Sequence, residues 1–160
     1  MEASAIDTRM ARAGAQVYWV LRAGLVALPV LAGIDKFFNW TVNWPDYLAG
    51  WINDIMPGTA QDFMYFVGGV EIAAGLIVLL APTIGGPLVA AWLAGIIINL
   101  LTAEPPEYYD IALRDFGLFL AAVAFSRLAW AYHGGLRAPV APPSRRAMAS
   151  PATEGRPGRA

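Results

Sequence analysis

Apolar residues fall in four blocks along the chain, and short polar stretches separate the blocks. A helix rises about 1.5 Å per residue, so about 20 apolar residues cross the roughly 30 Å hydrocarbon core of a bilayer. The pattern predicts four membrane-spanning helices, at about 17–38, 62–81, 87–102 and 110–132. Residues 82–87, which include two prolines and two glycines, are expected to form a tight turn. We therefore predict an all-α polytopic membrane protein, with the four spans in an antiparallel bundle.

The loop between the first two predicted spans has a helical pattern of its own. Trp44-Pro45 is typical of a helix start, and apolar residues then recur with helical spacing as far as residue 56. An amphipathic segment that carries Trp and Tyr is typical of a helix lying flat at a membrane interface. We predict a short interfacial helix at about 45–56, with Trp40, Trp44 and Trp51 as interfacial aromatic residues.

Basic residues predict how the chain is oriented in the membrane. Arg9 and Arg12 precede the first span and five arginines follow the last, whereas residues 39–109 contain neither Lys nor Arg. By the positive-inside rule both termini are cytoplasmic, which requires an even number of spans. We expect a multi-pass protein of the plasma (inner) membrane of a bacterial-type cell.

The composition agrees with one membrane domain between two short polar ends. Hydrophobic residues make up 58% of the 160 residues and charged residues 14%, against about 45–50% and about 25% in soluble domains. We expect residues 1–15 to be a cytoplasmic N-terminal segment and residues 16–132 to be the membrane domain. The Pro-, Ala- and Arg-rich residues 133–160 are expected to form a disordered basic cytoplasmic tail.

Few residues of this chain could ligate a redox centre. It has no cysteine, and His133 is its single histidine. Bis-histidine haem, iron–sulfur clusters and structural zinc sites need ligands that are missing here. We therefore assign no catalytic and no metal-ligating residue. A redox centre would belong to a partner or to a diffusible carrier, and a quinone could serve as that carrier.

One carboxylate, Glu71, lies near the middle of the second span, with Gly68 and Gly75 on the same helical face. A carboxylate at this depth costs a few kcal/mol or more, so it should face protein or a cavity, and small residues beside it let a neighbouring helix come close. The topology gathers further polar residues of the other spans in the outer half of the membrane. The candidate intramembrane polar cluster comprises Asp35, Lys36, Glu71, Asn99, Arg114 and Asp115.

Two roles for this cluster stay open at this point. Ion pairs could simply fix the register of the helices. Alternatively, the cluster could form a pocket roofed by the three tryptophans, in which Glu71 handles a proton or holds a ligand head group. Arg22 and Arg127, toward the opposite membrane face, are interpreted as basic anchors.

Three motifs carry a family resemblance: Arg22 followed by Gly33-Ile34-Asp35-Lys36, the segment Gly69–Leu76, and the segment Tyr109–Gly117. In order and spacing they resemble the first, second and last helices of the DoxX-like family of small four-helix membrane proteins. The likeness covers about residues 17–132. It implies an accessory subunit of a membrane oxidoreductase or quinone-linked system, with no redox centre of its own, rather than a stand-alone enzyme.

Two other functions are compatible with the sequence. The chain could conduct protons or a small solute with Glu71 as the titrating group, and would then act as a homo-oligomer, since four helices enclose only a narrow path. It could also be a scaffold whose basic tail binds anionic lipid. In each case the lipid bilayer is a partner and nucleic acid is not.

Overall fold

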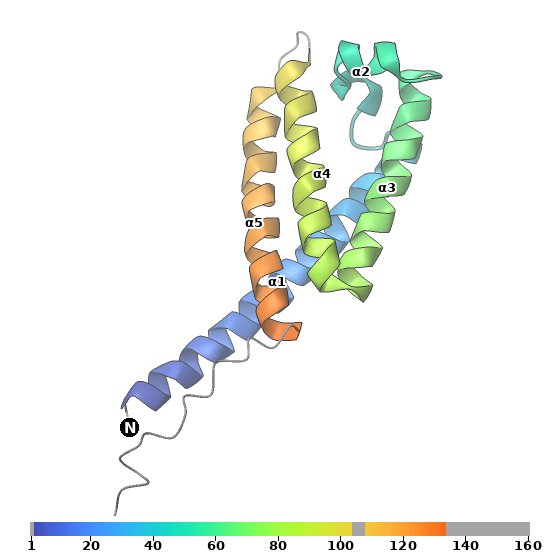
Figure 1. Ribbon diagram of the computed structural model, residues 1–160. Helices are drawn as coiled ribbons and strands as arrows, with labels where there is room; N and C mark the ends of the chain where they lie inside the picture. The colour runs from blue at the N-terminus through green and yellow to red at the C-terminus, as the bar shows by residue number, and fades with distance from the viewer. Residues whose placement is uncertain (1, 104–107, 134–160) are drawn as a thin grey trace, which may run out of the picture.

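The computed structural model describes residues 2–103 and 108–133 (Figure 1). The predicted tail from residue 134 onward and the acidic loop residues 104–107 lie outside the described residues. Within the described part every regular element is a helix: α1 (Glu2–Phe38), the 3₁₀ helix η1 (Trp44–Tyr47), α2 (Gly50–Ile55), α3 (Ala60–Leu80), α4 (Pro82–Thr102) and α5 (Tyr109–His133). The predicted all-α fold class is confirmed.

Three of the described helices are long and apolar enough to cross a membrane, namely α1 over Ala5–Phe38, α3 and α4. They indicate membrane association, as predicted. Helix α5 has 25 residues, which is long enough to span, but it contains Arg114, Asp115 and Arg127 and is not among the three helices that are apolar enough to cross a membrane. The fourth span therefore stays a prediction.

Two helices begin earlier than the hydrophobic pattern indicates. Helix α1 begins at Glu2, well before the predicted span, because the polar residues ahead of the span include no proline and are rich in alanine. Helix α4 begins at Pro82, so residues 82–87 are its first turns and the prediction of a tight turn there is wrong. Proline fits this position because the first helical N–H groups have no partner inside the helix.

The glycines of the predicted turn have a packing role instead. A Cβ atom added to Gly85 would lie 2.5 Å from Cα of Val78, and one added to Gly86 would lie 2.6 Å from Oγ of Ser126. Both distances are too short for real Cβ contacts. Glycine at these positions therefore lets α4 touch the backbones of α3 and α5 close to Ala81, the residue that joins α3 to α4.

The prediction of one continuous helix at 45–56 is wrong, since the structure has two short helices, η1 and α2, with a break between them. Asn99 of α4 explains the break. Its Nδ2 donates a 2.7 Å hydrogen bond to the C=O of Tyr47, and its Oδ1 accepts a 2.9 Å hydrogen bond from the N–H of Ala49. These contacts satisfy backbone groups that a continuous helix would have used itself. Such a long-range partner leaves no mark in the local sequence pattern.

The long helices pack as two pairs, α1 with α3 and α4 with α5 (Figure 1). Glycines bring α1 and α3 together, because a Cβ added to Gly68 would lie 2.7 Å from the C=O oxygen of Gly33, and one on Gly75 would lie 2.9 Å from that of Val26. The small residues beside Glu71 thus allow the close helix approach that the sequence predicts.

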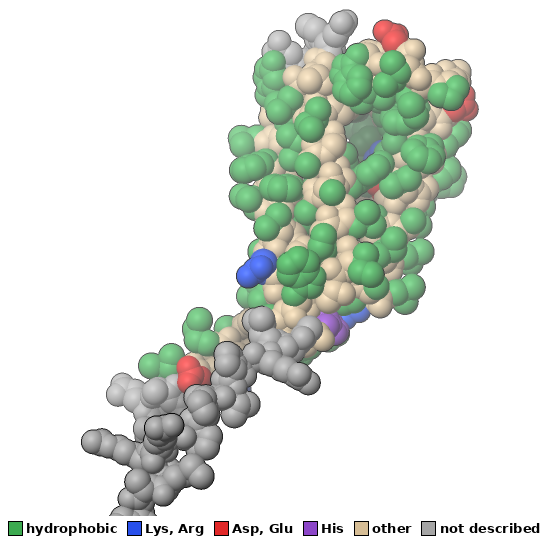
Figure 2. Space-filling model, in the orientation of Figure 1, with side chains coloured by type: hydrophobic (Ala, Val, Ile, Leu, Met, Phe, Trp, Pro, Cys, Tyr) green, Lys and Arg blue, Asp and Glu red, His purple; other side chains and the backbone are tan. Residues whose placement is uncertain are grey.

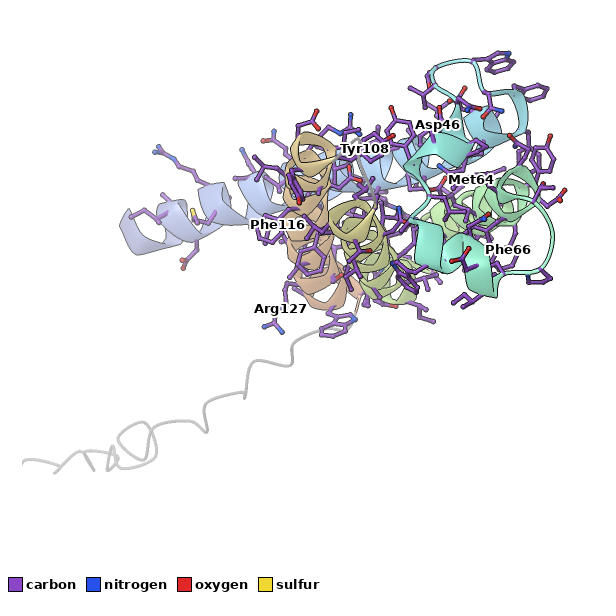
Figure 3. The ribbon with its side chains drawn as sticks, turned by 90° about the horizontal axis from the view of Figure 1, so that it is seen from above. Asp46, Met64, Phe66, Tyr108, Phe116 and Arg127 are labelled. Atoms are coloured by element: carbon purple, nitrogen blue, oxygen red, sulfur yellow. The ribbon has the colours of Figure 1, made fainter. Side chains whose placement is uncertain are left out.

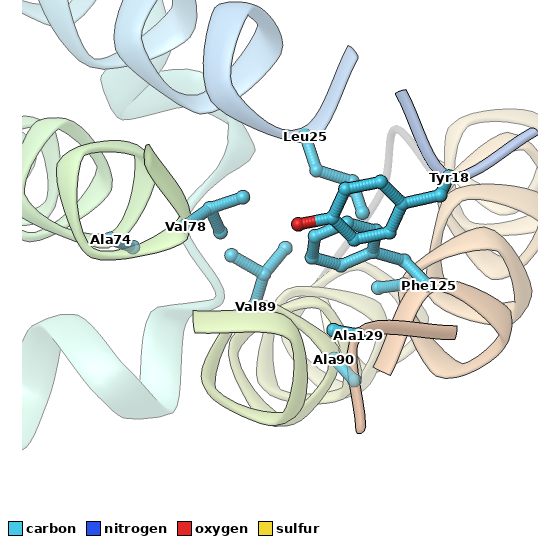
Figure 4. Close-up of a cluster of buried hydrophobic side chains, with 9 residues drawn as sticks. Tyr18, Leu25, Ala74, Val78, Val89, Ala90, Phe125 and Ala129 are labelled. Atoms are coloured by element: carbon cyan, nitrogen blue, oxygen red, sulfur yellow. The ribbon is translucent and has the colours of Figure 1, made fainter. Parts of the chain in front are cut away.

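The two pairs meet at the turn end of the bundle, where Ala81 joins α3 to α4. Tyr18, Val78, Val89 and Phe125 are buried there in one apolar cluster that draws on all four long helices (Figure 4). The ring of Tyr18 stacks on that of Phe125 with the centroids 5.5 Å apart. This cluster is the core of the protein.

At the opposite end, the loop end, the segment containing η1 and α2 connects the pairs. The indole Nε1 of Trp51 donates a 2.9 Å hydrogen bond to Oγ1 of Thr102, and the hydroxyl of Tyr108 donates one of 2.9 Å to the C=O of Asp46. Seen from above, Asp46 and Tyr108 lie near one another (Figure 3). The segment thus leaves α1, reaches over to α4 and α5, and returns to α3.

Candidate functional site

A buried ion pair joins α1 and α3. Nζ of Lys36 lies 2.8 Å from a carboxylate oxygen of Glu71, and the two side chains are only 5% and 6% exposed. A Cβ on Gly68 would lie 3.2 Å from Cβ of Lys36, so glycine at this position leaves room for the lysine. Nζ of Lys36 also lies 3.6 Å from the centroid of the Trp44 ring, which makes a cation–π contact. Lys36 is therefore held between a carboxylate and an indole.

The ion pair lines a cavity of about 720 Å³ between the two helix pairs. Most of the wall is apolar, with Leu25 and Val67 among its residues, and Trp44 and Leu48 of the loop contribute as well. Figure 2 shows a hollow in the surface between α3 and α4, beneath α2, with basic and acidic atoms visible in its depth. Ligand pockets typically have this composition, an apolar wall with a few polar groups.

Two polar atoms of the cavity lining are buried and lack a hydrogen-bond partner among the described residues. One is Oε2 of Glu71, which touches Lys36 without the alignment of a hydrogen bond, and the other is Nε1 of Trp92 on α4. The indole N–H of Trp92 is directed at the Glu71 carboxylate. A buried donor without an aligned hydrogen bond typically costs about 1–3 kcal/mol, so the Trp92 N–H can bind an acceptor on a ligand in the cavity, whereas Oε2 of Glu71 is held by Lys36 at 2.8 Å.

Sequence reasoning missed Trp92. A tryptophan in an apolar span usually faces lipid or the core, and its residue type does not mark a site. The signal that could have identified it is its spacing: Trp92 and Asn99 are seven residues apart and so lie on one face of α4, and both line the cavity.

Asp35 lies apart from the cavity, although it neighbours Lys36 in the chain. Its carboxylate accepts hydrogen bonds from the N–H of Trp40 at 2.9 Å, from Nε1 of Trp44 at 2.7 Å, and from the N–H and hydroxyl of Thr41. These contacts fix the chain where it leaves α1. Asp35 thereby orients Trp44 over Lys36.

The other polar residues of the predicted cluster line the cavity from the α4–α5 side. Asn99 does so while it holds the break between η1 and α2. Arg114 and Asp115 form a looser ion pair of 3.5 Å, in which the arginine side chain is 69% exposed and the aspartate 12%. Five of the six predicted residues thus face one cavity, and Lys36 with Glu71 is their buried centre.

Of the predicted aromatic and basic residues outside the cluster, one lines the cavity and the others lie elsewhere. Of the three tryptophans only Trp44 lines the cavity, while Trp40 is exposed and Trp51 binds Thr102. Arg22 is half-buried at the turn end, where it donates hydrogen bonds to the hydroxyl of Tyr18 and to a backbone C=O of α3. Arg127 is exposed on α5 and points away from the bundle (Figure 3).

Comparison of the chain with protein-family models, with curated proteins and with solved structures finds no match. The resemblance to DoxX-like proteins therefore stays a prediction. Within residues 2–103 and 108–133, no three His, Asp or Glu side chains come together as a group that could hold a metal ion.

Proposed function

We propose that α1, α3, α4 and α5 all cross the plasma membrane of a bacterial-type cell, with both termini in the cytoplasm and the loop end outside. The close pairing of α5 with α4, which is itself apolar enough to span, supports this topology (Figure 1). Residues 116–126 of α5 carry no charge. Arg114 and Asp115 lie toward one end of this stretch and Arg127 toward the other, where charged side chains can reach the interfaces.

We further propose that the cavity binds the head group of a lipid-soluble carrier of the quinone class. The observation that carries this proposal is the buried Lys36–Glu71 ion pair in a largely apolar cavity, with Nε1 of Trp92 buried in the cavity lining without an aligned hydrogen bond. A quinone carbonyl can accept a hydrogen bond from Trp92 or Lys36. The hydroxyl of the reduced form can donate one to Glu71.

In this proposal the protein is an accessory subunit that holds the carrier for an oxidoreductase partner, and the partner supplies the redox centre. The resemblance to DoxX-like proteins supports this role. The buried Trp92 N–H without an aligned hydrogen bond, in the same cavity as the ion pair, favours a binding role over a purely structural cluster.

Proton or solute conduction is less well supported. A conducting path would have to continue from the cavity to the turn end, where the apolar cluster around Tyr18, Val78, Val89 and Phe125 is tightly buried. The scaffold alternative depends on the basic tail, which lies outside the described residues.

The binding proposal can be tested with decyl-ubiquinone and the purified protein in mild detergent. A ligand that binds only the folded state raises the unfolding temperature with its concentration. Trp92→Phe removes the N–H and keeps an aromatic ring, and should weaken binding about 2- to 10-fold, the equivalent of one hydrogen bond. Trp130→Phe is the matched control, since its Nε1 binds the C=O of Thr83 away from the cavity. Equal affinity of the Trp92→Phe and Trp130→Phe variants, or no shift for the wild type, would refute the proposal.

A further inference from the structure

The cavity is open on one side of the bundle. At the turn end α3 and α4 touch through Gly85 and Val78, and from there the two helices diverge toward the loop end (Figure 1). The hollow in Figure 2 lies in the space between the diverging helices. Gly95 of α4 lines the cavity and is exposed, and a Cβ added to it would meet nothing within 4 Å. Gly95 therefore lies at the rim of the opening.

The loop end is covered. Trp44, Tyr47, Leu48 and Ile52 line the cavity from the η1–α2 segment, and the hydrogen bonds to Asn99 hold that segment across the gap between the pairs. In the proposed topology the η1–α2 segment thus lies over the cavity on its aqueous side, while the side between α3 and α4 is open.

The exposed side chains of the two helices that border the opening are largely apolar. Phe66 and Leu76 on α3, and Leu88 and Ile98 on α4, are all exposed. These are two of the helices that are apolar enough to span a membrane. In the proposed topology their outward faces contact lipid tails, so the opening between them faces the hydrocarbon core.

The charges in the cavity indicate what kind of molecule it admits. Lys36 and Glu71 neutralise one another at 2.8 Å, so the buried centre has no net charge to offer an ion. An ionic solute would also lose its hydration on entering an apolar opening. The neutral ion pair, and the Trp92 N–H without an aligned hydrogen bond, instead suit a neutral head group that can donate or accept a hydrogen bond.

We propose that the cavity is loaded sideways from the bilayer, through the gap between α3 and α4, by a neutral molecule dissolved in the membrane. This inference rests on the proposed function for its ligand and on the geometry of the opening for its route. A water-soluble solute arriving at the loop end is not the ligand in this account.

Spin labelling tests the route directly, because the chain has no cysteine and each single-cysteine variant carries one label. Gly95→Cys places the label at the rim. Gly117→Cys is the control, since Gly117 is exposed on α5, outside the cavity lining, with nothing within 4 Å of an added Cβ. Gly95 lies seven residues before the end of α4 and Gly117 eight after the start of α5, so the two labels have similar depths.

In liposomes, both labels should collide readily with oxygen, which concentrates in lipid, and rarely with a water-soluble nickel chelate. Adding decyl-ubiquinone should lower the oxygen accessibility at position 95 at least twofold and leave position 117 unchanged. Ile96→Cys, also on the cavity lining, serves as a second reporter if Gly95→Cys does not fold.

High accessibility to the nickel chelate at position 95 would overturn the inference, because the opening would then face water. If the label at position 95 is accessible to oxygen but does not respond to decyl-ubiquinone, the opening faces lipid as inferred. The assignment of a quinone as the ligand would then be refuted. The two failures are thus distinguishable.

Discussion

Removing Lys36 while keeping Glu71 should be among the most damaging single changes in this protein. At 2.8 Å, two unit charges attract by about 6 kcal/mol at an effective dielectric constant of about 20. The Lys36→Met variant loses less free energy of unfolding than this attraction, because Glu71 can take up a proton. For a carboxyl group with an ordinary pKa of about 4.3, protonation at pH 7 costs about 3.7 kcal/mol. We expect Lys36→Met to lower the free energy of unfolding by about 2–4 kcal/mol at pH 7.

This deficit should depend on pH in one direction only. Protonating the orphaned carboxylate becomes easier in acid and costs about 1.6 kcal/mol at pH 5.5. The Lys36→Met variant should therefore approach the wild type as the pH falls and depart from it as the pH rises. Adding Glu71→Gln removes the orphaned charge, so the double variant should recover at least half of the loss at pH 7.

The assay is a reversible denaturant titration in mild detergent, followed by far-ultraviolet circular dichroism at pH 7 and pH 5.5. Arg114→Met is the matched control, because its ion pair with Asp115 is long and its side chain is 69% exposed. An exposed pair contributes at most about 1 kcal/mol. A pH-independent deficit for Lys36→Met, or a double variant with strictly additive losses, would show that Glu71 is not left as a buried unpaired charge.

Three further changes have defined outcomes. Gly68→Ala forces a Cβ to 2.7 Å from the Gly33 carbonyl oxygen and should destabilise by about 1–3 kcal/mol in the same titration, whereas Gly69→Ala meets nothing within 4 Å and should be neutral or stabilising. Equal effects of the two would contradict the close α1–α3 contact. Asn99→Ala removes the two hydrogen bonds that hold the backbone between η1 and α2. Amide hydrogen exchange over residues 44–55 should then become at least tenfold faster, while that of α3 stays unchanged. Unchanged exchange over residues 44–55 would show that other contacts hold the segment. Burial raises the pKa of Tyr108 above its usual value of about 10, as do Tyr47 and Asp46 beside it. The tyrosinate absorbance that is lost in the Tyr108→Phe variant should therefore appear only above pH 10. Its appearance below pH 10 would contradict this environment.

The ion pair illustrates what the sequence can predict. A charge at membrane depth is costly wherever it lies, so Glu71 must have a partner or a cavity. The glycines at helical spacing around it mark the face where a neighbouring backbone approaches. These two facts depend only on local spacing. With the predicted topology they place Glu71 in a cluster of six polar residues that includes Lys36, and the structure shows that these two form the closest buried ion pair among the described residues.

The contributions of Trp92 and Asn99 could not be predicted in the same way. Trp92 belongs to the site because the helix pairs diverge and leave a space beside it, which is a property of the tertiary packing. Asn99 interrupts a helix some fifty residues away in the chain. Similarly, α4 starts at Pro82 because Gly85 and Gly86 fit closely against α3 and α5. The local sequence does not show this fit, since two glycines between two prolines are equally typical of a turn.

If the cavity holds a lipid-soluble carrier for an oxidoreductase partner, both should stay with the protein when it is extracted from the membrane. The most direct test is affinity purification of the tagged protein from its native membranes in mild detergent, followed by mass spectrometry of the co-eluting proteins and of the extracted lipids. We expect a quinone at close to one per chain together with a stoichiometric oxidoreductase, and loss of the quinone in the Glu71→Gln variant. A homo-oligomer that elutes alone and without quinone would contradict it.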